Sequence, residues 1–268
     1  MSCVSALRWA KLGPIPLAGA FALGLGQAIA QAALPAGFVY LRDIDPTIGQ
    51  DIRYATADNF TGRPLDGYAA AECILKREVA AALKRVQADL TDSGLALKVY
   101  DCYRPHRAVR AMAQWAHDGR ADGASKRFLP AVSKNALFAL GYLAGVSRHS
   151  TGTAVDVTLL ERAHAAAAAP FDPAAKYAPC TAAVTARAPD DGVDMGTGYD
   201  CFDANSRTRS SAIGAEPQRR RALLVAIMAK HGFRNYHREW WHFSFAIAAP
   251  PPHYDFPIRP RTAKAQAD

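Results

Sequence analysis

The sequence predicts an α+β fold in which helices flank a small central antiparallel or mixed sheet within a single domain. Two segments carry apolar residues at helical spacing, a third helix is expected to begin at a proline, and three shorter segments alternate as strands do. The two kinds follow one another without the regular spacing of βαβ units, which favours the α+β class. Half of the 268 residues are apolar and 21% are charged, an ordinary globular composition for a chain able to bury a substantial core.

The first 30 residues differ from the rest of the chain. Two basic residues precede an uncharged apolar run, residues 12–30, which ends in a small-x-small pattern. This arrangement is typical of a secretory signal peptide, with an uncleaved membrane anchor as the alternative. Glycines and prolines lower the hydrophobicity of the run and favour cleavage. We therefore expect a signal peptide over 1–30, a mature domain over 31–268 in the periplasm, and no stable membrane association after cleavage.

The first half of the mature region predicts an extended segment, two helices and a strand. Residues 38–54 are expected to be extended, with short strands. Residues 69–90 carry an apolar helical face and predict a helix. Residues 95–100 alternate between apolar and other side chains, as a strand does. Proline is tolerated in a first helical turn, so a second helix is expected from Pro105 to about His117.

The second half predicts two strands, a long loop and a helix. Residues 154–158 predict a short strand, and 241–245 predict the last one. Between them, residues 160–194 are rich in Ala, Pro and Asp and are expected to form a long surface loop. Residues 217–231 show helical spacing, and Gly232 ends that helix.

The distribution of charge argues against a nucleic-acid partner. The formal net charge is +8, two of which would leave with the signal peptide. The remaining basic residues are scattered except for Arg219–Arg221, which is expected to be a solvated helix face and not a nucleic-acid site. A basic exported protein would be attracted to an acidic cell wall.

Four cysteines belong to the mature region, namely Cys73, Cys102, Cys180 and Cys201. An even number in an oxidising compartment permits two disulfides, with three possible connectivities. Pairing Cys180 with Cys201 is favoured because it would close a polar loop. None forms a C-x-x-C pair, which argues against a structural zinc knuckle.

The first chemical motif is Ser147-Arg148-His149-Ser150-Thr151-Gly152-Thr153-Ala154-Val155-Asp156-Val157. In the predicted strand, Val155 and Val157 point to one side and Asp156 to the other. Gly152 would let the preceding loop turn so that His149 reaches the same space as Asp156. Alone, this pair would be interpreted as a surface hydrogen bond.

The second motif is Glu239-Trp240-Trp241-His242-Phe243. In the last strand, His242 lies opposite the apolar face formed by Trp241 and Phe243, which are expected in the core. Glu239 is three residues earlier, so a regular strand would point it away from His242. Both side chains serve one site only if Glu239 lies at a bend before the strand.

Together the two motifs predict a zinc site. Two imidazoles and a carboxylate, from His149, His242 and Asp156, suit one zinc ion per chain with a position open for water. Bound zinc lowers the pKa of that water and polarises a carbonyl oxygen. Glu239, a carboxylate that is not a ligand, is the candidate for moving the proton. No G-x-S-x-G motif supports a non-metal hydrolase.

A third motif is Asp101-Cys102-Tyr103-Arg104-Pro105. Pro105 disfavours helical geometry at Arg104 and places its guanidinium at a strand-to-helix junction. There Arg104 would stabilise a developing oxyanion. An Arg104–Asp101 ion pair that stiffens the turn is the alternative, and both can hold.

These motifs, in order, resemble the D-alanyl-D-alanine dipeptidases, zinc peptidases of the vancomycin-resistance type. The resemblance spans about residues 38–257, and its further blocks are residues 54–62 and 195–200. It implies zinc bound by the three predicted ligands, Glu239 as catalytic base and acid, and Arg104 as transition-state stabiliser. It also implies that Tyr54, Ser147 and Asp200 hold the amino end of the substrate.

The implied function is hydrolysis of D-Ala-D-Ala or similar small dipeptides derived from peptidoglycan. One alternative is a zinc D,D-carboxypeptidase or murein peptidase that acts on longer stem peptides. The other is a non-catalytic, zinc-containing protein that binds cell-wall peptides. An intact Glu239 argues against the second alternative, because a binding protein has no use for a positioned base.

Overall fold

The computed structural model describes residues 33–120, 123–162, 169–249 and 251–261. The predicted signal peptide over 1–30 lies outside this range. Within it, no helix combines the length and hydropathy needed to cross a bilayer.

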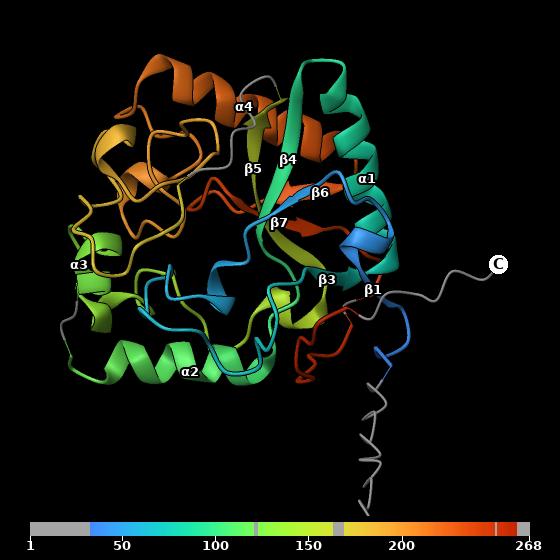
Figure 1. The fold of residues 1–268 in the computed structure, drawn as a ribbon, viewed down its shortest axis with the longest axis horizontal. Helices are drawn as coiled ribbons and strands as arrows, with labels where there is room; N and C mark the ends of the chain where they lie inside the picture. The colour runs from blue at the N-terminus through green and yellow to red at the C-terminus, as the bar shows by residue number, and fades with distance from the viewer. Residues whose placement is uncertain (1–32, 121–122, 163–168, 250, 262–268) are drawn as a thin grey trace, which may run out of the picture. The chain divides into compact units, whose positions relative to one another are not determined.

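A five-stranded mixed sheet forms the centre of the fold, with the strand order β2-β4-β5-β7-β6 (Figure 1). Its strands are β2 (Gly49–Gln50), β4 (Leu95–Asp101), β5 (Ala154–Glu161), β6 (Phe233–Asn235) and β7 (His242–Phe245). β2 runs parallel to β4, and the other neighbours are antiparallel. A separate antiparallel pair joins β1 (Phe38–Tyr40) to β3 (Ile74–Lys76). The predicted α+β class with a mixed sheet is confirmed.

Two long helices cover one face of this sheet. The described α-helices are α1 (Arg77–Thr91), α2 (His106–His117), α3 (Gly123–Phe128) and α4 (Ala215–Lys230). α1 packs against β4, α4 packs against β6, and the two helices contact each other. Val155 and Val157 of β5 lie in the same buried core as Leu83 of α1 and Leu224 of α4. The apolar face of β5 therefore packs toward α1 and α4, and Asp156 points to the opposite face, where Lys98 and Thr158 are also buried.

Two predicted boundaries are wrong. The helix expected over 69–90 begins only at Arg77, because Ile74 and Leu75 pair with β1 as strand residues. Apolar side chains at 74 and 75 fit a helix or a strand equally well, and pairing decides. The loop expected from residue 160 begins later, because β5 continues to Glu161 by pairing with β4.

Ion pairs and a hydrogen bond hold the second half of the expected surface loop against the face of the sheet opposite α1 and α4. Asp190 lies 2.6 Å from Lys98 Nζ and 2.7 Å from the Arg53 guanidinium, and it accepts a hydrogen bond from Tyr100. Burial opposes the charge of Asp190, but these two cations lower its pKa to about 2. Buried charges need such partners, and here they fix the loop beside the sheet.

One prediction about the basic run is wrong. Arg219 and Arg220 pair with Glu216 on a solvated face, but Arg221 is buried. Its guanidinium donates to backbone carbonyl oxygens of the loop at Met195, Asn205 and Arg207. Irregular backbone leaves carbonyls without partners, and an inward-pointing arginine satisfies three of them.

Both disulfides join parts of the chain that carry site residues. The favoured Cys180–Cys201 pair is present, and Cys73 pairs with Cys102. The Cys180–Cys201 disulfide closes a loop that contains Asp200. The Cys73–Cys102 disulfide joins the residue before β3 to the residue after β4.

Candidate active site

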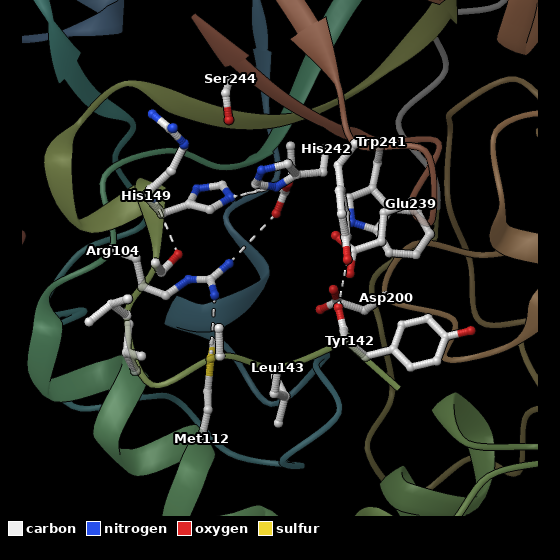
Figure 2. A pocket seen from close by; sticks show the side chains of 18 of the residues that line it. Arg104, Met112, Tyr142, Leu143, His149, Asp200, Glu239, Trp241, His242 and Ser244 are labelled. Atoms are coloured by element: carbon white, nitrogen blue, oxygen red, sulfur yellow. Dashed lines mark hydrogen bonds and ion pairs between the residues drawn. The ribbon is translucent and has the colours of Figure 1, made fainter. Parts of the chain in front are cut away.

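The three predicted metal ligands converge on the face of the sheet opposite α1 and α4 (Figure 2). Asp156 and His242 are register partners on β5 and β7, so their side chains leave the sheet side by side. His149 comes from the short 3-10 helix Arg148–Thr151. One nitrogen from each histidine and an oxygen of Asp156 lie within 4.8 Å of one another.

Gly152 provides the turn that brings His149 back to the strand. Its φ is +74°, a left-handed value that side chains disfavour, and a Cβ there would lie 2.3 Å from the Phe38 ring. The predicted role of this glycine is confirmed.

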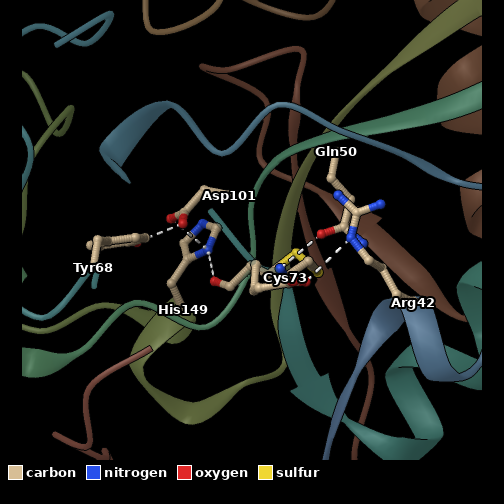
Figure 3. Close-up of a disulfide and its surroundings, with 8 residues drawn as sticks. Arg42, Gln50, Tyr68, Cys73, Asp101 and His149 are labelled. Carbon is tan, nitrogen blue, oxygen red and sulfur yellow. Dashed lines mark hydrogen bonds and ion pairs between the residues drawn. A yellow bond between two sulfur atoms is a disulfide. The ribbon is translucent and has the colours of Figure 1, made fainter. Parts of the chain in front are cut away.

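The ring of His149 is oriented by the backbone behind it (Figure 3). His149 Nδ1 lies 2.7 Å from the carbonyl oxygen of Cys102, so Nδ1 donates there and Nε2 points toward Asp156 and His242. That Nε2 faces Asp156 Oδ1 at 3.3 Å. A backbone carbonyl that fixes the tautomer of a histidine is a common feature of metal ligands.

Asp156 is held in its ionised form. Burial opposes its charge, but the imidazoles of His149 and His242 outweigh burial and lower its pKa. Its Oδ2 accepts a hydrogen bond of 2.9 Å from Tyr199, while Oδ1 faces the histidines. This donor set, two imidazole nitrogens and one carboxylate oxygen, fits a divalent metal ion with an open position.

Arg104 lies beside the ligands, at the junction of β4 and α2. Its guanidinium pairs with Asp101 at 2.8 Å and lies 3.7 Å from Asp156 Oδ2. It also stacks over the Tyr54 ring at 4.8 Å. The expected Arg104–Asp101 ion pair therefore exists, and the same guanidinium still lines the cavity.

Glu239 lies in the turn immediately before β7, as the prediction of a bend requires. Its N–H bonds to the Tyr236 carbonyl, and its own carbonyl accepts the N–H of His242. Burial and then the charges of Asp156 and Asp200 raise the pKa of the Glu239 carboxyl well above its usual value. A raised pKa makes the carboxylate a better proton acceptor, as a general base needs.

On the far side of Glu239, Asp200 and Tyr54 form a second polar group. Tyr54 donates a hydrogen bond of 2.7 Å to Asp200 Oδ2. Asp200 is only 5% exposed, and burial followed by the charge of Asp156 raises its pKa to about 8. Its φ is +54°, which aspartate tolerates better than most residues. Among the residues that the structure describes, none forms an ion pair with Asp200, so a cation from a ligand could stabilise its charge.

Ser147 also lines the cavity. Its hydroxyl oxygen accepts the N–H of His149 at 3.2 Å and so caps the short helix. All eight predicted site residues line a single cavity of about 610 Å³, namely Tyr54, Arg104, Ser147, His149, Asp156, Asp200, Glu239 and His242.

Two supporting residues were not predicted. Tyr199 bonds to Asp156, and Tyr68 donates to Asp101 at 2.6 Å, which fixes the carboxylate behind Arg104. Tyr199 adjoins Asp200 in a block that the sequence had already singled out. Nothing local marked Tyr68.

Comparison with known proteins agrees with this geometry. A family model described as D-ala-D-ala dipeptidase matches residues 35–172 and 163–259. The chain is 30% identical to the D-alanyl-D-alanine dipeptidase of Enterococcus faecium over 224 residues, 83% of this chain and 98% of the relative. It is 32% identical to that of Streptomyces coelicolor over 222 residues, 82% and 98% of the two chains. The dipeptidase of Enterococcus faecalis is 33% identical over 208 residues, 77% and 90%. The chain belongs to the D-Ala-D-Ala dipeptidase family of metallopeptidases.

Proposed function

We propose that this protein is a zinc-dependent dipeptidase that hydrolyses D-Ala-D-Ala or similar small D-amino-acid dipeptides derived from peptidoglycan. The observation that carries the proposal is the convergence of His149, Asp156 and His242 in one cavity with Glu239.

Zinc is the metal that the donor set favours. Three protein ligands of imidazole and carboxylate type, with a further position open, are typical of catalytic zinc. Bound in this cavity, zinc would supply Lewis acidity, lowering the pKa of water and polarising a peptide carbonyl. The Cys102 carbonyl behind His149 and the Tyr199 hydroxyl behind Asp156 support the ligands in the orientation they need.

The substrate's ammonium group would bind at Asp200. A protonated amine supplies the cation that this buried carboxylate lacks, and it stabilises the ionised form against the raised pKa. Tyr54 holds Asp200 in place. Ser147 contributes a second lone pair on its hydroxyl oxygen, because the His149 N–H uses only one.

Proton transfer and charge stabilisation would fall to Glu239 and Arg104. Glu239 takes a proton from the attacking water and returns it to the leaving amine, work for which its raised pKa is suited. Arg104, fixed by Asp101, presents a permanent positive charge to the oxygen of the peptide carbonyl as negative charge develops there.

A dipeptide fits better than a longer stem peptide because of where the buried acid lies. Asp200 and Glu239 line the same cavity, so a free amino group is recognised close to the bond that is cleaved. The rival activity, a D,D-carboxypeptidase or murein peptidase, has no need of a buried amine-binding acid at that position.

The test begins with the purified mature protein. Metal content is measured first, and cleavage of D-Ala-D-Ala and of a pentapeptide stem is then assayed before and after chelation. We expect about one zinc per chain, faster cleavage of the dipeptide, and loss of activity that zinc restores. Faster cleavage of the pentapeptide would make the dipeptidase proposal wrong. Zinc without cleavage of either peptide would favour the binding protein.

We also propose export to the periplasm. Two disulfides in the described chain support it, because disulfides persist in oxidising compartments. Fractionation of cells expressing the full chain, with N-terminal sequencing of the product, tests this. A cytoplasmic protein that keeps its first 30 residues would contradict it.

A further inference from the structure

Two arginines that the proposed reaction does not use line the same cavity, Arg148 and Arg234. Arg148 immediately precedes the ligand His149. Arg234 is the central residue of β6 and lies opposite Ser244 of β7. Because side chains alternate along a strand, Ser244 shares the face of His242, and so does its cross-strand partner Arg234. The fold therefore places both arginines on the metal-binding side of the sheet.

Neither guanidinium is neutralised by the protein. Within the described ranges, no carboxylate and no hydrogen-bond acceptor contacts the side chain of Arg148 or of Arg234, and both residues are exposed. Arg104, by contrast, is paired with Asp101, and the buried Arg221 with backbone carbonyls. The two cavity arginines are therefore free to bind an anion from solution.

The charges of the cavity are separated along its length. Asp200 and Glu239 lie on one side of His242, whereas Ser244, which neighbours Arg234, lies on the other (Figure 2). One end is thus acidic and the other, where Arg234 lies, is basic, with His242 between them. Arg148 lines the same cavity next to the ligand His149. A small peptide with both termini free carries a positive amine and a negative carboxylate at opposite ends. Its charges match those of the cavity in only one direction.

We propose that Arg148 and Arg234 form the subsite for the substrate's terminal carboxylate and so determine that the substrate is a free, unextended dipeptide. This inference rests on the proposed function, which assigns the amino end to Asp200. With the ammonium at Asp200 and the scissile carbonyl at the metal ligands, the carboxylate of the second residue extends toward the basic end. An amidated or extended C-terminus would lose this attraction.

The experiment compares two substrates, D-Ala-D-Ala and D-alanyl-D-alaninamide, in the zinc-loaded wild-type protein and in Arg148→Gln, Arg234→Gln and the double variant. Because both arginines are solvent-exposed, we expect each single change to raise KM for the free dipeptide about 3- to 10-fold, with kcat nearly unchanged. KM for the amide should stay within about twofold, because it has no carboxylate to lose. Added salt should raise KM for the dipeptide more than for the amide.

Two controls separate this subsite from structural effects. Arg209→Gln removes an exposed arginine that does not line the cavity, and it should change neither KM. Zinc content must be equal in all variants, because Arg148 adjoins His149. Rescue in Arg148→Lys supports a role of charge.

The subsite is overturned if the free dipeptide and the amide respond equally to the arginine changes, or if wild type prefers the amide. A wild-type protein that cleaves neither substrate would instead overturn the proposed function, and this subsite with it.

Discussion

The two polar walls of the cavity are built by different means. The sheet wall consists of Asp156 and His242 on paired strands, with His149 in the turn that leads into β5. The loop wall consists of Asp200, which lies in a loop, and Tyr54, which lies in the short 3-10 helix Arg53–Ala55. Strand register positions the first wall, so its geometry follows from backbone hydrogen bonds.

The loop wall depends on side chains from distant parts of the chain. Within the described ranges, Asp200 is the one residue other than glycine with a positive φ. The Cys180–Cys201 disulfide, the Tyr54 hydroxyl and the guanidinium of Arg221 hold the segment around it. The two walls meet in one hydrogen bond, which Tyr199, beside Asp200, donates to Asp156. Their other supports are separate, so metal affinity and substrate affinity should respond to different mutations.

The largest effects are expected at the sheet wall and its neighbour Glu239. In His242→Ala both zinc and turnover should be lost, because one of three ligands is gone. In Glu239→Ala zinc should stay while kcat falls roughly 10²- to 10⁴-fold, the usual contribution of a general acid–base group. Metal analysis together with kcat distinguishes the two variants. Turnover like that of wild type in Glu239→Ala would remove Glu239 from the mechanism.

The same contrast explains what the sequence could predict. Alternation over 154–158 and 241–245 predicted strands whose polar face carries Asp156 and His242, because strand geometry is local and periodic. The loop wall has no period. Tyr54 and Asp200 are 146 residues apart, and only the family resemblance suggested that they act together.

Two predictions were wrong for the same reason, namely that distant parts of the chain determine the local structure. Arg221 was expected to be solvated because the carbonyls that bury it come from a loop whose path no local pattern determines. The start of α1 was placed too early because Ile74 and Leu75 are assigned to a strand by their partners on β1. In both cases the outcome depends on partners that are distant in the sequence, which are carbonyl oxygens for Arg221 and strand β1 for Ile74 and Leu75.

Next in size is the effect of Asp200→Asn on the loop wall. The amide keeps the shape and can still accept the Tyr54 hydrogen bond, but it removes the anion. We expect KM for D-Ala-D-Ala to rise roughly 10- to 100-fold, the usual value of a hydrogen bond to a charged group. Zinc content should not change. Steady-state kinetics and metal analysis test this, and a loss of zinc would show that the walls are not separable.

Removing each disulfide in turn gives a matched test of the two walls, with smaller expected effects than those of Asp200→Asn. They close segments of similar length, with sequence separations of 29 and 21, so their loss should destabilise the fold similarly. Replacing Cys73 and Cys102 by alanine frees the carbonyl that orients His149, and zinc affinity should fall about 10-fold. Replacing Cys180 and Cys201 should instead raise KM.

Chelator competition and steady-state kinetics, below the unfolding temperature of both variants, measure these two quantities. The wild type reduced while still folded gives a further comparison if either variant folds poorly. Equal losses of zinc affinity in both variants would contradict separate support of the walls.

The last prediction concerns the pH dependence of stability in the metal-free protein. The pKa of Asp200 is raised from 3.8 to about 8, chiefly by burial. The folded chain therefore keeps a proton that the unfolded chain releases near pH 4. Between about pH 4 and 8 the folded state binds more protons, so this group makes the free energy of unfolding fall as pH rises, by at most about 1.4 kcal/mol per pH unit. Above about pH 8 its contribution is constant.

Denaturant unfolding of wild type and Asp200→Asn across this range measures the effect, because groups that do not interact with Asp200 cancel in the difference between the two proteins. Glu239, whose pKa the charge of Asp200 raises, is the neighbour that does not cancel. The wild-type curve should decline more steeply from about pH 4 to about 8 and then run parallel to that of the variant. Adding zinc should flatten the difference, because a cation beside Asp156 offsets the second cause of the raised pKa. Parallel curves throughout would mean that Asp200 ionises normally in the fold, and the loop wall would then carry a permanent charge before any substrate arrives.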